Sequence, residues 1–84
     1  MENNLNIIKE NFKELPNNIE AEQAVIGSIL VTNEIFDDIN TIISYLNFYD
    51  PMHQKIFNAI ESMIYKGLLA NPITLKNYFE NEKD

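Results

Sequence analysis

The sequence predicts an all-α domain, a small orthogonal bundle of about four helices. Apolar residues recur at helical spacing in three consecutive segments, residues typical of helix starts and stops border these segments, and no segment alternates with a period of two residues. A chain of 84 residues is long enough for one domain with one modest core. Because the chain has no cysteine, packing without disulfides has to hold that core together.

Residues 1–15 are predicted to form a flexible leader ahead of a helical domain at residues 16–84. The leader is rich in Asn, Glu and Lys, and Pro16 disfavours a helical conformation at the residue before it. An alternative is a short amphipathic helix that docks on a partner, because the apolar residues of the leader fall at helical spacing. These residues are Leu5, Ile8, Phe12 and Leu15.

The first predicted helix spans residues 19–31. Two asparagines after Pro16 are suitable N-caps, and Glu20 and Glu22 place negative charge in the first turn. Since residues two apart point to different sides of a helix, we interpret Glu20 and Glu22 as helix-start electrostatics and not as a shared proton or metal site. The apolar positions of this helix are Ile19, Ala21, Val25, Ile26, Ile29 and Leu30.

The second predicted helix opens at Asn33 and continues to Leu46. Its apolar residues follow the i, i+1, i+4, i+7, i+8, i+11 pattern of one buried helical face, although its isoleucines lower the intrinsic helix propensity. These residues are Ile35, Phe36, Ile39, Ile42, Ile43 and Leu46.

The third predicted helix starts with Asp50 as N-cap and Pro51 at the first helical position, where its missing N–H costs nothing. Lys66 suits its last turn, and Gly67 can take the left-handed conformation that ends it. The stripe of this helix consists of Ile56, Phe57, Ile60, Met63 and Ile64.

The fourth predicted helix follows a connector at residues 68–72. We expect Thr74 to cap it and three residues to be buried, before polar residues 80–84 end the chain. The three are Leu75, Tyr78 and Phe79.

Several functions are disfavoured by composition. Thirteen acidic against six basic side chains give a net charge of −7 with no arginine, so we expect no direct nucleic-acid binding by this chain. Only Gly27 and Gly67 are glycines and neither stands in a phosphate-binding loop, so we expect no NTPase site, no cofactor and no catalytic residue. No apolar run approaches the length that spans a membrane, and we expect a cytoplasmic protein without membrane contact.

A few residues stand out as candidates for structural or interface roles. His53 is the only histidine, and without cysteine or a second histidine we expect a capping or packing role and no metal. Gly27 inside a helix predicts close approach of another helix backbone. Tyr45 and Tyr65 near helix ends suit a protein interface. The residues expected to support helix packing are Gly27, Ile56, Phe57 and Ile60.

The sequence resembles the N-terminal domain of the DnaB-type replicative DNA helicases in three segments, in the right order and over most of residues 15–79. The first segment is Leu15–Leu30, in which a Pro precedes Glu-Ala-Glu-Gln and an apolar helix containing Gly. Thr74 stands where that family commonly has Asp, a minor departure at a helix cap. The other two segments carry Phe48, Tyr49, Pro51, His53, Ile56 and Phe57, and then Gly67, Pro72, Ile73, Thr74 and Leu75.

This resemblance implies the globular head of a collar domain above a hexameric ring, which helps recruit primase and helicase loader and contacts other helicase subunits. ATP and Mg²⁺ are implied only for the ATPase domain, which this sequence does not include. The family's helical hairpin after the head is also missing from it. The resemblance therefore implies no enzymatic activity for these 84 residues.

The sequence also allows two interpretations without catalysis, and an enzymatic one. One is the helicase-binding helical domain of a primase, against which the Glu-Ala-Glu-Gln segment after Pro16 argues. The other is an acidic, DNA-mimicking inhibitor that binds a basic protein surface. A small metal-dependent hydrolase using Glu22 and His53 is a distant third.

Overall fold

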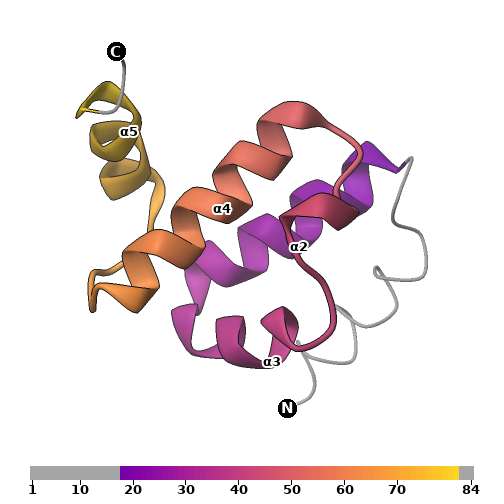
Figure 1. Ribbon diagram of the computed structural model, residues 1–84, viewed down its shortest axis with the longest axis horizontal. Helices are drawn as coiled ribbons and strands as arrows, with labels where there is room; N and C mark the ends of the chain where they lie inside the picture. The colour runs from indigo at the N-terminus through magenta and orange to yellow at the C-terminus, as the bar shows by residue number, and fades with distance from the viewer. Residues whose placement is uncertain (1–17, 82–84) are drawn as a thin grey trace.

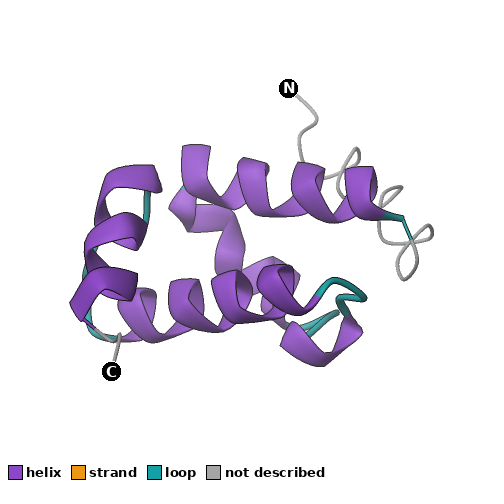
Figure 2. Cartoon of the chain, turned by 90° about the horizontal axis from the view of Figure 1, so that it is seen from above, coloured by secondary structure: helices purple, strands orange, loops and turns teal. Residues whose placement is uncertain are grey.

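The computed structural model describes residues 18–81, so the predicted leader at residues 1–15 lies outside the described residues. This part of the chain is built from helices and loops and contains no strand, which confirms the predicted all-α class (Figure 2). Its helices are α2 (Ile19–Val31), α3 (Phe36–Asn40), α4 (Pro51–Tyr65) and α5 (Pro72–Asn81), with short 3₁₀ helices η1 (Asn33–Ile35) and η2 (Tyr45–Asn47).

The helices α2 and α4 lie side by side and form the body of the domain, with α3 beneath them and α5 set across the C-terminal end of α4 (Figure 1). Three phenylalanines join the layers: the ring centroid of Phe57 on α4 lies 5.4 Å from that of Phe36 and 5.0 Å from that of Phe48. All three rings are buried, and α2 contributes Val25 and Ile29 to the same core.

The predicted bounds of the first and third helices are confirmed. Asn18 caps α2 by accepting a hydrogen bond from the Ala21 amide at 2.9 Å. The Asp50 carboxylate caps α4 by accepting from the amides of Met52 and His53. Such caps satisfy first-turn amides that have no partner inside the helix.

The end of α4 is a Schellman motif around Gly67, which has a φ of 79°. The Gly67 amide donates to the Ile64 carbonyl at 3.0 Å, and the Leu68 amide donates to the Met63 carbonyl at 2.9 Å. Gly67 therefore occupies the left-handed position that was expected to end this helix.

The predicted second helix was wrong in its extent, because α3 ends at Asn40. Ser44 starts a separate 3₁₀ turn: its hydroxyl accepts from the Leu46 amide, and its own amide donates to the Asn47 side chain at 2.8 Å. Local hydrogen bonds of this kind compete with a continuing helix. As a consequence Ile42 and Leu46, which were expected in the buried stripe, are exposed.

The predicted cap of the fourth helix was also wrong. Asn71 is the residue whose side-chain oxygen accepts from the amides of Ile73 and Thr74, both at 2.9 Å. A second hydrogen bond runs in the opposite direction, from the Asn71 amide to the Thr74 hydroxyl. The helix therefore begins at Pro72, and Thr74 lies inside its first turn as the third helical residue.

Candidate protein-interaction surfaces

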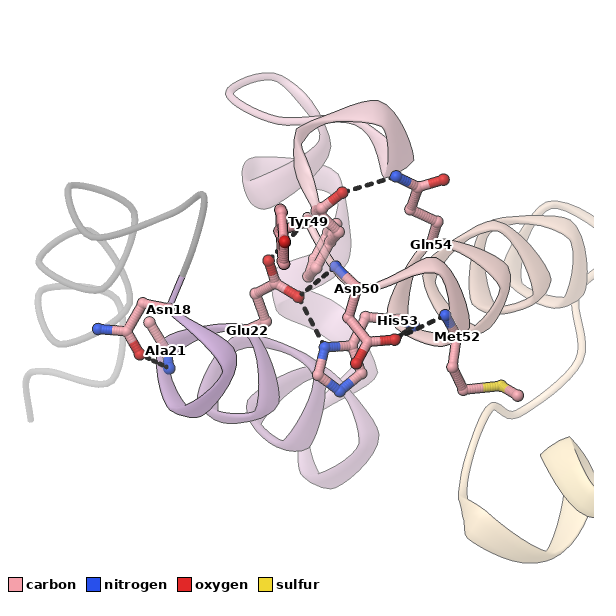
Figure 3. A network of polar contacts seen from close by, with 9 residues as sticks. Asn18, Ala21, Glu22, Tyr49, Asp50, Met52, His53 and Gln54 are labelled. Carbon is pink, nitrogen blue, oxygen red and sulfur yellow. Dashed lines mark hydrogen bonds and ion pairs between the residues drawn. The ribbon is translucent and has the colours of Figure 1, made fainter.

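A buried polar cluster around Glu22 holds the start of α4 against α2 (Figure 3). Glu22 has an exposed fraction of 0%. Its carboxylate accepts from the Tyr49 amide at 2.5 Å and from the Asp50 amide at 3.3 Å, and it lies 2.7 Å from Nδ1 of His53. Because a carboxylate can only accept, the His53 ring nitrogen is the donor in this contact.

The cluster anchors the start of α4 to α2. Both carboxylate oxygens of Glu22 are occupied by protein donors, and His53 is itself buried beside the Phe48 ring. Within residues 18–81 there is no group of three or more side chains that could hold a metal ion. These contacts fix the backbone between η2 and α4, and Gln54 adds a hydrogen bond to the Phe48 carbonyl at 2.7 Å.

The interpretation of Glu22 as helix-start electrostatics missed this role. Glu22 belongs to the first turn of α2 as expected, but it is buried while Glu20 is exposed. A signal was present in the sequence, since Glu22 precedes Val25, Ile26 and Ile29 by three, four and seven residues and so lies on their apolar face. His53 has the packing role that was predicted.

The anchored segment presents large side chains to solvent. We define the η2 patch as the exposed residues Tyr45, Leu46, Tyr49 and Met52. Tyr65, the other predicted interface residue, lies elsewhere: it is the last residue of α4, its hydroxyl accepts from the Asn40 side chain at 3.1 Å, and its ring meets Phe36 edge-on. The structure therefore does not bring Tyr45 and Tyr65 into one surface element.

A second exposed apolar feature is a groove of about 300 Å³ between the end of α4, the following connector and α5. We call it the α5 groove. Its lining residues are Met63, Leu68, Leu69, Thr74, Asn77, Tyr78 and Asn81.

The four residues expected to support helix packing have different environments. Phe57 and Ile60 are completely buried, and Ile56 is half-buried against the core. Gly27 does not meet the expectation: a Cβ atom built there finds no heavy atom of a described residue within 4 Å beyond its own helix backbone. It lies instead in an open hollow of about 520 Å³ along α2, which is also lined by Ala24, Ser28, Val31 and Thr32.

The described residues form a small helical domain with a buried polar cluster around Glu22 and with exposed apolar side chains in the η2 patch and the α5 groove. A model of the DnaB-like helicase N-terminal domain family matches residues 14–84. The chain belongs to this family. None of the described helices is long and apolar enough to cross a membrane.

Several replicative DNA helicases are similar to the chain. The replicative DNA helicase DnaB of Rickettsia typhi is 43% identical over 81 residues, which cover 89% of this chain and 16% of that protein. The helicase of the same name from Rickettsia prowazekii is 44% identical over 63 residues, which cover 75% of this chain and 13% of that protein. The one from Buchnera aphidicola subsp. Baizongia pistaciae is 37% identical over 79 residues, which cover 94% of this chain and 17% of that protein. No solved structure matches the chain.

Proposed function

We propose that this chain acts as the N-terminal interaction domain of a replicative DNA helicase. In this role it contributes contacts to other helicase subunits in a collar and docks primase or a helicase loader. The observation that carries the proposal is the family match over residues 14–84. The matched relatives are replicative DNA helicases of which this chain covers only about a sixth.

The residues on the surface support a contact role. The η2 patch and the α5 groove present Tyr, Leu and Met side chains. Tyr and Met are more frequent in protein interfaces than on the rest of a protein surface. Residues 18–81 offer no cluster with which to bind a catalytic metal. In this proposal, ATP, Mg²⁺ and the unwinding reaction belong to parts of the helicase outside this domain. The domain works in the cytoplasm, where DNA is replicated in bacteria.

The test is the molar mass of the purified chain by light scattering, alone and then mixed with full-length Rickettsia typhi DnaB or with the primase of that organism. We expect the chain to co-elute with at least one of them. An equal concentration of a small acidic helical protein without this fold is the control for charge. If the chain joins neither complex, the interaction role is wrong and the family match marks ancestry alone.

A further inference from the structure

The η2 patch lies beside the point where the chain enters α2. Glu22 joins the two: its amide donates to the Asn18 carbonyl at 3.1 Å, and its carboxylate accepts from the Tyr49 amide (Figure 3). Asn18 is the N-cap of α2, and Tyr49 belongs to the patch. Asn18 and Glu22 are about one helical turn apart, roughly 6 Å along the axis, so the residues that precede Asn18 begin close to an exposed apolar surface.

This surface carries little charge. Asp50 is the only Asp, Glu, Lys or Arg among residues 41–54, and its carboxylate is occupied in capping α4. Ile19 extends the apolar area on the α2 side, because it is exposed and precedes Glu22 by three residues on the same side of the helix. Large apolar side chains gathered on a surface mark a contact site. An apolar occupant fits this one better than a charged one.

Residues 1–15 carry an apolar face that could meet the patch. Four apolar residues fall at the i, i+3, i+7, i+10 spacing of one helical face, and Glu10 and Glu14 fall on the opposite side. Amphipathic helices bind apolar surfaces through anchors at such spacing. Only residues 16–18 separate this segment from α2, a length within the range of about 2–8 residues that commonly connects two helices. The four apolar residues are Leu5, Ile8, Phe12 and Leu15.

We propose that residues 1–15 bind the η2 patch of their own chain as an amphipathic helix. A helix this short is marginal by itself, and burial of its apolar face against the patch supplies the missing stability. The short connection raises the local concentration of the segment at the patch to about the millimolar range, so a weak contact is sufficient. A partner that docks on the η2 patch has to displace the segment. The contact is made within one chain, so it does not depend on the proposed function.

Cross-linking within one chain tests the contact, because the chain has no cysteine of its own. Asn11→Cys places a thiol at the edge of the apolar face, and Lys55→Cys places a second one on α4, one turn after Met52 of the patch. The matched control pairs Asn11→Cys with Ala24→Cys, an exposed position two residues after Glu22 and so on another side of α2. With a short bis-maleimide we expect a cross-link within one chain from the Lys55 pair and little from the Ala24 pair.

The chemical accessibility of two tyrosines provides the second test. Tyr49 in the patch is 61% exposed, and Tyr65 outside it is 66% exposed. We expect nitration of Tyr49 by tetranitromethane, measured relative to Tyr65, to rise several-fold when Phe12→Asp removes an apolar anchor. Asn6→Asp adds the same charge away from the apolar face and should leave the ratio unchanged. Mass spectrometry of the peptides gives the rate at each tyrosine.

Each of the following results would overturn the proposal. Equal cross-linking of the Lys55 and Ala24 pairs would show that the connection alone brings the thiols together. A Tyr49 to Tyr65 ratio that Phe12→Asp leaves unchanged would show that the segment does not cover the patch. A cross-linked product with the mass of two chains would mean that the segment binds a second copy and not its own chain.

Discussion

The Glu22 carboxylate lies 2.7 Å from Nδ1 of His53, and the two residues are 31 positions apart in the chain. This contact joins the first turn of α2 to the first turn of α4, and the same carboxylate also accepts from the amides of Tyr49 and Asp50, which precede α4. Asp50 in turn caps α4. A single buried side chain therefore links the start of one helix to the start of the other.

Glu22→Gln is expected to lower the free energy of unfolding by about 1–3 kcal/mol, because an amide offers one acceptor oxygen where the carboxylate offers two to the buried donors. Glu22→Ala should cost more, since all three donors then lose their partner. The matched control is Glu20→Gln in the same helical turn, where Glu20 is exposed. Urea unfolding followed by circular dichroism measures the three variants, and a Glu20→Gln effect as large as that of Glu22→Gln would contradict the anchoring role.

Asn33 makes a second long-range connection, between the end of α2 and the connector before α5. Its side chain donates to the carbonyls of Ala70 and Ile29 at 2.9 and 2.8 Å, and its oxygen accepts from the Ala70 amide at 2.8 Å. Asn33→Asp replaces the donor with an oxygen that faces two carbonyl oxygens. We expect a loss of about 1–3 kcal/mol in unfolding free energy.

Asn40→Asp is the control for this substitution, since the Asn40 side chain makes one exposed hydrogen bond, to the Tyr65 hydroxyl. Its effect should stay within about 0.5 kcal/mol, as for most surface changes. Thermal unfolding at one pH compares the two. Equal destabilisation by both variants would show that the Ala70 contact contributes little.

The helix boundaries that were predicted correctly depend on near neighbours in the chain. Asn18 and Asp50 cap amides within three residues, and Gly67 ends its helix through its own backbone conformation. Such signals act locally and can be read from short stretches of sequence. The same locality explains the mistake at Ser44, where a local turn competes with an apolar pattern that continues at helical spacing.

The role of Glu22 was not predicted because its partners are distant in the sequence. Two acids in a first helical turn already have a sufficient local explanation. The spacing of Glu22 to the apolar residues of its helix separates it from Glu20, but only the position of Tyr49, Asp50 and His53 in space shows what Glu22 binds. Gly27 failed for a related reason. A glycine in a helix lowers the stability of that helix, but its neighbours in space decide whether close packing compensates for the lost free energy.

Gly27→Ala is now expected to stabilise the domain. The added methyl group meets no heavy atom of a described residue within 4 Å beyond its chain neighbours and its own helix backbone, while alanine favours the helix by about 0.5–1 kcal/mol relative to glycine. Melting temperature measured by calorimetry should rise by several degrees, which is the shift that about 1 kcal/mol produces in a small domain. A lower melting temperature would indicate that this face of α2 is packed in solution.

Gly67→Ala provides the opposite expectation with the same added methyl group. Its surroundings are equally open, since no heavy atom of a described residue beyond Gly67 and its two chain neighbours lies within 4 Å of the built Cβ, but its φ of 79° is strained for any residue with a side chain. We expect a loss of about 1 kcal/mol or more, as αL positions favour glycine. The Schellman hydrogen bonds from Gly67 and Leu68 depend on this conformation, so calorimetry should show a lower melting temperature.

Gly67→Asn is the control, because asparagine tolerates the left-handed region better than alanine and should recover part of the lost stability. If Gly67→Ala and Gly27→Ala shift the melting temperature in the same direction, backbone conformation does not control the end of α4 as the geometry implies.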